Sequence, residues 1–207
     1  MLDFNLYKPS DLEIWISARY KEHGILIPSD LTIKAVSQAF GVEVKYYSGP
    51  CFAQWEENSY SFIFLKEDLC YEELRKEFFH ELCHPLRHVG IQDSMPSTFQ
   101  DLQEAQAAQF QMVAAMPYFM LEKFEPTKYL HHYLTIISEA FQLPYSFVKQ
   151  RIEYILRKIS NEREERNLRS RSTFKPIIYT YSDATNNILN QLNRQIAESR
   201  GRYRVED

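Results

Sequence analysis

The chain of 207 residues has little glycine, little cysteine and no long apolar segment. Its 5 Gly and 9 Pro are too few for a collagen-like or low-complexity protein. Its 3 Cys are an odd number without CxxC spacing, which argues against a disulfide framework and favours a reducing compartment. No apolar run approaches the ~20 residues that cross a bilayer, and no basic segment followed by an apolar one marks a signal peptide at the N-terminus. We therefore expect a cytoplasmic protein with no membrane segment.

A strong excess of charge of one sign is also missing. The 24 Lys and Arg nearly balance the 28 Asp and Glu, and the formal net charge is −4. This balance argues against a protein held on nucleic acid by non-specific contacts. The apolar fraction of 44% and the aromatic fraction of 14% can supply a sizeable core, so wholesale disorder is excluded. The length fits one domain, or one domain with a small appendage.

Capping residues and apolar periodicity predict two helices and a small sheet in the N-terminal third. Pro9-Ser10-Asp11 begins the first helix and Gly24 ends it; Pro28-Ser29-Asp30 begins the second and Gly41 ends it. Three strands are expected at residues 42–47, 52–55 and 60–65, the last two forming a hairpin.

The rest of the chain is predominantly helical in pattern. The pair of helices around Gln142-Leu143-Pro144 resembles a helix-turn-helix. Residues 160–175 are charged and are interpreted as a frayed helix end or linker. The expected helices cover residues 69–88, 102–116, 129–141, 145–159 and 183–199.

One motif indicates chemistry: His80-Glu81-Leu82-Cys83-His84 is H-E-x-x-H within a predicted helix. Positions i and i+4 share a helix face, so both imidazoles can reach one Zn²⁺ at ~2.0–2.1 Å. Glu81 is rotated by roughly 100° from His80 and does not complete the metal set. It can reach a metal-bound water as general base. The alternative is a helix with two surface or structural histidines.

A catalytic zinc site needs three protein ligands and an open fourth position, whereas a structural site would need four protein ligands. His88 lies about 12 Å from His80 along the helix axis and cannot complete a tetrahedron with both motif histidines. The metzincin pattern is excluded because Arg87 and Gly90 stand where it has Gly and His. Glu104 remains, near the start of the next helix, where an antiparallel neighbour would bring a carboxylate. An ordinary surface Glu is the alternative.

The residues around Glu104 carry a family resemblance. Glu104-x-x-Ala107-x-x-Phe110 followed by Met116-Pro117, downstream of H-E-x-x-H, resembles the ImmA/IrrE family of zinc metallopeptidases. The resemblance covers roughly residues 10–157.

The resemblance implies a role for each motif residue. His80, His84 and Glu104 would bind zinc, and Glu81 would be the base. The members most similar in pattern are anti-repressor proteases of mobile elements and phages, which cleave a helix-turn-helix repressor. The resemblance therefore implies a zinc-dependent endopeptidase.

Two residues depart from the family pattern. Cys83 stands where the family usually has Gly, and it is interpreted as a small buried hydrophobe, with metal competition or oxidation sensing as alternatives. Pro85 removes one helical N–H and disfavours the α conformation at His84, so a kink or helix end at the second ligand is expected.

Two further groups of residues have functional and structural interpretations. His131-His132 could stabilise an oxyanion, but a solvated or capping pair is favoured. The helix pair at 129–159 could contact DNA, but Glu153 interrupts its basic face and nucleic acid is not an expected partner. The basic residues on or near its second helix are Lys149, Arg151, Arg157 and Lys158.

Together these features predict an α+β, zincin-like fold, with a small, mostly antiparallel sheet packed on the H-E-x-x-H helix and a helical C-terminal half. The expected domains are a metallopeptidase domain at 1–124, a helix-turn-helix-like region at 125–160, and a charged linker with a C-terminal helix at 161–207. The expected partner is a repressor protein, bound in extended form along the hairpin edge. The alternative is a non-proteolytic repressor- or DNA-binding module with a vestigial metal site.

Overall fold

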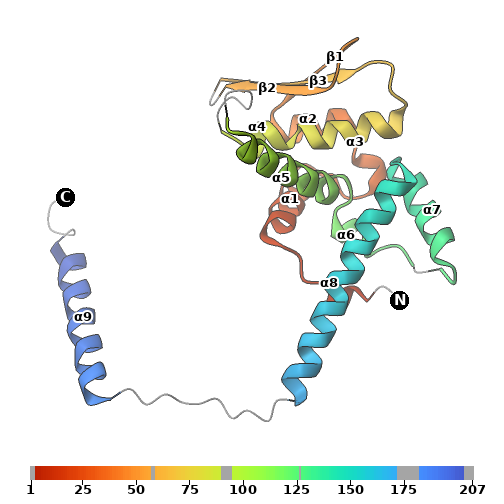
Figure 1. The fold of residues 1–207 in the computed structure, drawn as a ribbon. Helices are drawn as coiled ribbons and strands as arrows, with labels where there is room; N and C mark the ends of the chain where they lie inside the picture. Colours follow the sequence, from red (N-terminus) through yellow and green to blue (C-terminus); the bar gives the residue numbers. More distant parts are fainter. Residues whose placement is uncertain (1–2, 57–58, 90–94, 126, 172–181, 203–207) are drawn as a thin grey trace. The chain divides into compact units, whose positions relative to one another are not determined.

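The computed structural model describes residues 3–56, 59–89, 95–125, 127–171 and 182–202. The chain divides into two compact units, Met1–Arg166 and Asn167–Asp207. The first unit contains a small sheet and most of the helices, which confirms the predicted α+β class (Figure 1). Domain boundaries at 124 and 160 stay a prediction. Within the described ranges no helix is long and apolar enough to cross a membrane.

The first helix begins at the predicted cap Ser10 and the second ends at the predicted Gly41, but the predicted start of the second helix is wrong. Pro28–Asp30 forms a separate 3-10 helix, and the second helix begins after Thr32, whose hydroxyl accepts a hydrogen bond from the Ala35 amide. The Ser10 hydroxyl accepts a hydrogen bond from the Glu13 amide, and the Glu13 carboxylate accepts one from the Ser10 amide. Gly41 ends the second helix with φ of 69°, in the left-handed region that favours glycine. These elements are η1 (Phe4–Leu6), α1 (Asp11–Glu22), η2 (Pro28–Asp30) and α2 (Ile33–Phe40).

The sheet has the strand order β1-β3-β2. β2 and β3 form the predicted antiparallel hairpin, whereas β1 pairs with β3 in parallel, so the sheet is mixed where mostly antiparallel pairing was expected. β3 contains the fully buried Ile63 and Leu65, and this most apolar strand therefore takes the centre with a neighbour on each side. The strands are β1 (Glu43–Tyr47), β2 (Phe52–Glu56) and β3 (Tyr60–Lys66).

The helix that carries the H-E-x-x-H motif is divided in two. α3 (Tyr71–Glu81) and α4 (Cys83–Arg87) are separated by Leu82 alone, so the expected interruption of the 69–88 helix falls two residues before His84. Pro85 explains the division, because it has no N–H for the Glu81 carbonyl at i−4. Leu82 keeps helical dihedral angles, with φ of −62° and ψ of −27°, so the two segments still present the motif histidines on neighbouring turns.

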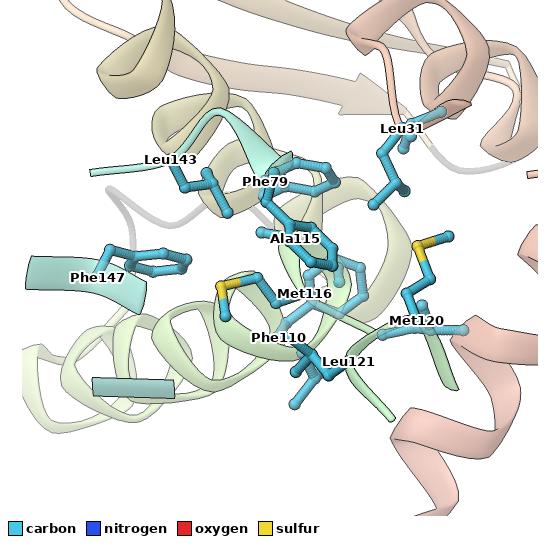
Figure 2. Packing of buried hydrophobic residues seen from close by; sticks show 14 of the residues in the cluster. Leu31, Phe79, Phe110, Ala115, Met116, Met120, Leu121, Leu143 and Phe147 are labelled. Atoms are coloured by element: carbon cyan, nitrogen blue, oxygen red, sulfur yellow. The ribbon is translucent and has the colours of Figure 1, made fainter. Parts of the chain in front are cut away.

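The core fixes α3 relative to α5 (Ser97–Ala115), which contacts it on the side away from β3 (Figure 1). Figure 2 shows Phe79 of α3 near Phe110 of α5, with Met116 beside them. All three side chains are essentially inaccessible to solvent, and each such burial stabilises the fold by about 1.5–3 kcal/mol. This packing sets the separation between the motif histidines and the first turns of α5.

The C-terminal half continues with α6 (Tyr118–Leu121), α7 (Leu130–Phe141), α8 (Tyr145–Arg171) and α9 (Asp183–Arg202). Gln142, with φ of 51°, makes the tight turn between α7 and α8 that the helix-turn-helix-like pattern predicts. α8 continues beyond residue 160, where a frayed end or linker was expected, and residues 172–181 lie outside the described ranges.

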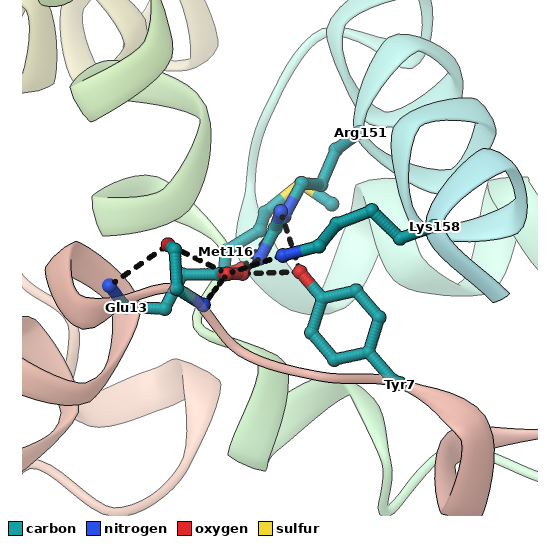
Figure 3. A network of polar contacts seen from close by, with 6 residues as sticks. Tyr7, Glu13, Met116, Arg151 and Lys158 are labelled. Atoms are coloured by element: carbon teal, nitrogen blue, oxygen red, sulfur yellow. Dashed lines mark hydrogen bonds and ion pairs between the residues drawn. The ribbon is translucent and has the colours of Figure 1, made fainter. Parts of the chain in front are cut away.

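A buried polar network connects α8 to α1 (Figure 3). The Arg151 guanidinium lies 2.7 Å from the Glu13 carboxylate and donates a hydrogen bond of 3.2 Å to the Met116 carbonyl. The Tyr7 hydroxyl also donates to Glu13. Lys158 lies 3.4 Å from the second carboxylate oxygen of Glu13. Two of the four basic residues considered for DNA contact are therefore engaged inside the fold.

Candidate metal centre

Three predicted ligands from three different elements converge at one point. His80 lies on α3, His84 on α4 and Glu104 on α5. The Nε2 atom of His80 is 3.1 Å from one Glu104 carboxylate oxygen, and the Nε2 atom of His84 is 3.8 Å from the other. One ligand atom from each residue lies within 4.8 Å of the other two. Only residues 88–96 separate α4 from α5 in the sequence, and the two helices pack against each other. This packing brings Glu104 close to the motif histidines.

The donor set fits a zinc ion. Two imidazoles and one carboxylate are a typical catalytic set that leaves a fourth position for water or substrate. The side chains of His84, His80 and Glu104 are 5%, 21% and 47% exposed, so the group is buried at one end and open at the other. Burial is the main cause that lowers the pKa of His84, to about 4. The ring is therefore neutral near pH 7, as a metal ligand must be.

Glu81 lies beside this group in a largely buried position, with 8% of its surface exposed. Burial, followed by the nearby charges of Glu77 and Glu104, raises the pKa of its carboxyl to about 7. The backbone N–H of Ala53, on β2, donates a hydrogen bond to the carboxylate and opposes this rise. A carboxyl with a pKa near neutrality can both accept and return a proton at physiological pH.

Strand β2 lies at one edge of the sheet, where it pairs only with β3 in the described residues. Its Ala53 contacts Glu81, and the Trp55 ring lies nearly parallel to the His84 ring, with centroids 6.2 Å apart and planes 20° apart. An edge of a sheet therefore runs next to the candidate metal ligands. Such an edge can pair with an extended peptide.

Sequence reasoning missed the position of His88. This side chain is buried, and its Nδ1 atom lies 3.0 Å from Nδ1 of His84. Its Nε2 atom lies 3.2 Å from Oε1 of Gln106 on α5. The spacing from His84 to His88 is again i, i+4, so the sequence did contain the signal for this contact. From the sequence, His88 was considered only as a metal ligand. In the structure it contacts Nδ1 of His84, whereas Glu104 faces Nε2 of His84.

Other predicted candidates have structural surroundings. The Cys83 side chain is 1% exposed and burial raises its thiol pKa to about 12, as expected of a small buried hydrophobe. His131 and His132 are exposed, and Nδ1 of His131 lies 2.9 Å from the Tyr145 hydroxyl, as expected of a solvated or capping pair. An oxyanion role for this pair stays a prediction.

Comparison with known proteins places this geometry in context. The IrrE N-terminal-like domain, Peptidase_M78, matches residues 35–153. The phage-like element PBSX protein XkdA of Bacillus subtilis (strain 168) is 26% identical over 197 residues, 95% of this chain and 96% of that protein. The uncharacterized protein YqaB of the same strain is 27% identical over 154 residues, 74% of this chain and 89% of that protein. A Mycobacterium tuberculosis transcriptional regulator superposes with a TM-score of 0.48 and 15% identity, covering 71% of this chain and 48% of that structure.

Proposed function

Since the chain belongs to the Peptidase_M78 family of IrrE N-terminal-like domains, we propose that it is a zinc-dependent endopeptidase that cleaves a regulatory protein. One observation carries the proposal: His80, His84 and Glu104 offer ligand atoms within 4.8 Å of one another, with Glu81 buried beside them. A bound zinc ion would polarise the scissile carbonyl and acidify the attacking water. His80, His84 and Glu104 would hold it.

Glu81 acts as the general base in this proposal. Its carboxylate takes a proton from the attacking water and returns it to the leaving amine. The pKa of about 7 suits both steps, because ionised and protonated forms are then both populated near neutral pH. The Ala53 amide of β2 holds one orientation of the carboxylate through its hydrogen bond.

The substrate binds in extended form along the outer edge of β2. This edge lies beside both Glu81 and His84, so a peptide paired with it would pass the candidate ligands. We infer a helix-turn-helix repressor as the substrate, since one relative belongs to a phage-like element and such elements are kept silent by repressors. Cleavage of a repressor takes place in the cytoplasm.

Co-expression with helix-turn-helix repressors encoded near the gene for this chain tests the proposal. Wild-type protein should produce repressor fragments, whereas Glu81→Gln should lose about 10²–10⁴-fold in cleavage rate, because an amide cannot accept the proton. Glu73→Gln is the matched control on the same helix, since Glu73 is only partly buried and pairs with Lys76. It should cleave like the wild type.

The same experiment separates proteolysis from docking. If Glu81→Gln leaves the repressor intact and the target promoter silent, proteolysis is supported. If this variant cleaves nothing yet still activates the promoter, the chain releases the promoter by binding the repressor, and the docking alternative is favoured over cleavage.

A further inference from the structure

His88 forms a hydrogen-bonded chain with a candidate metal ligand and with the next helix. It directly follows α4, and its backbone N–H donates to the His84 carbonyl at 3.0 Å. Its two ring nitrogens face His84 Nδ1 at 3.0 Å and Gln106 Oε1 at 3.2 Å. Both nitrogens of a buried ring are thus engaged. These hydrogen bonds connect His84 of α4 to Gln106 of α5, two residues after Glu104.

The donors and acceptors in these hydrogen bonds fix the tautomers of His84 and His88. Gln106 Oε1 is a carbonyl oxygen and can only accept, so His88 Nε2 carries a proton and donates to it. A neutral His88 then has a bare Nδ1, which accepts from the Nδ1–H of His84. A neutral His84 with its proton on Nδ1 has a bare Nε2. Nε2 is the atom that faces Glu104, at 3.8 Å.

A purely structural role for His88 would be to fill space between α4 and α5. Space filling needs volume only and does not need a polar ring with hydrogen bonds at both nitrogens, which is costly to bury unless both are satisfied. Metal-binding histidines generally donate their second ring N–H to a partner that fixes the tautomer and the ring orientation. His84 has such a partner in His88, in addition to the contact of its ring with Trp55.

We propose that His88 is a positioning residue that, with Gln106, holds His84 as the Nδ1–H tautomer and so directs its bare Nε2 at the metal position. The inference rests on the proposed zinc site. It assigns His88 no contact with the metal or the substrate. Gln106 is exposed, so water can replace its carbonyl and its contribution is smaller than that of His88.

Zinc affinity, measured by competition with a chromophoric chelator, tests the inference on the full chain. His88→Phe keeps a flat aromatic ring but cannot accept a hydrogen bond, so zinc binding should weaken about 10–100-fold. His88→Asn should recover most of this loss, because its Oδ1 can take the place of Nδ1. His132→Phe, the same change at an exposed histidine, should bind zinc like the wild type. Thermal unfolding of the metal-free proteins checks that each variant is folded.

Affinity equal to wild type in folded His88→Phe would overturn the inference. Equal losses in His88→Phe and His88→Asn would also overturn it, because the hydrogen bond would then not be the cause. A wild type that binds no zinc would remove the proposed function and the role of His88 with it.

The tautomer can be measured without metal or activity. Long-range ¹H–¹⁵N correlation spectra of the metal-free protein at pH 7.5 should show the His84 proton on Nδ1 in the wild type. In His88→Phe it should move to Nε2, the usual site in a free neutral imidazole. A wild-type His84 with its proton on Nε2 would contradict the inference even if zinc binds, so the two failures are distinguishable.

Discussion

The buried ion pair between Glu13 of α1 and Arg151 of α8 allows a quantitative test of what holds the helical half to the rest of its unit (Figure 3). The two side chains are 1% and 0% exposed, and Arg151 Nη2 lies 2.7 Å from Glu13 Oε1. Replacement Glu13→Gln keeps the shape of the side chain and removes its charge. The Arg151 guanidinium and the Lys158 ammonium, 3.4 Å from the other oxygen, then lose their shared counter-charge.

The expected cost follows from burial and from the pKa of Glu13. Removal of one partner of a buried ion pair typically destabilises a protein by about 3–5 kcal/mol. Burial alone would raise the pKa of Glu13, but Arg151 and hydrogen bonds from Ser10 and Tyr7 lower it from 4.5 to about 2. At about 1.36 kcal/mol per pKa unit, this difference corresponds to about 3 kcal/mol. Glu13→Gln should therefore lower the free energy of unfolding by about 3–5 kcal/mol near pH 7.

The lowered pKa of Glu13 also determines how the stabilisation by this ion pair depends on pH. A carboxyl with a lower pKa in the folded state stabilises the fold fully above its unfolded pKa, here about 4.5, and loses this contribution as pH falls through about 2. The difference in unfolding free energy between wild type and Glu13→Gln should be constant above pH 5. It should shrink progressively as the pH falls from about 4.5 towards about 2.

Urea unfolding followed by tryptophan fluorescence measures these differences. Glu22→Gln is the matched control on α1, because Glu22 is 65% exposed and pairs with Arg19 at the surface. This change should alter stability by less than about 0.5 kcal/mol. A loss below about 1 kcal/mol in Glu13→Gln would refute the reasoning. So would a wild-type advantage that stays constant down to pH 2.

Further predictions concern the candidate site. Glu104→Gln should weaken zinc binding by more than about 100-fold, which exceeds the effect of residues that only orient a ligand. Glu122→Gln, at an exposed residue, should leave zinc binding unchanged. Chelator competition measures both, and the reverse pattern would show that Glu104 is not the third ligand. Cys83 should resist a thiol reagent in the folded protein while the exposed Cys70 reacts. Mass spectrometry of labelled peptides measures this, and equal labelling of both residues would contradict the burial of Cys83.

Much of the fold could be predicted from the sequence because local signals agree with it. Ser10 and Gly41 are capping signals that need only a few neighbouring residues, and the structure has them as expected. The H-E-x-x-H spacing likewise places His80 and His84 on one face through local geometry alone. Glu104 needed more than its spacing, and the family resemblance identified it.

The features that the sequence did not reveal depend on distant parts of the chain. Parallel pairing of β1 with β3 follows from competition among strands for the central position, which no single segment encodes. The sequence alone indicates that Arg151 is a basic residue on a helix surface. Only the packing of α8 against α1 shows that it forms an ion pair with Glu13. His88 had a local signal, but its partner Gln106 depends on how α5 packs against α4.

The dependence of cleavage on zinc tests the proposed activity most directly. Protein purified without added metal should contain about one zinc per chain. Removal of the metal by a chelator should abolish cleavage of the purified repressor, and one equivalent of zinc should restore it. Glu81→Gln, loaded with the same amount of zinc, should stay inactive. Cleavage at the wild-type rate by the metal-free protein, or by zinc-loaded Glu81→Gln, would contradict the proposal.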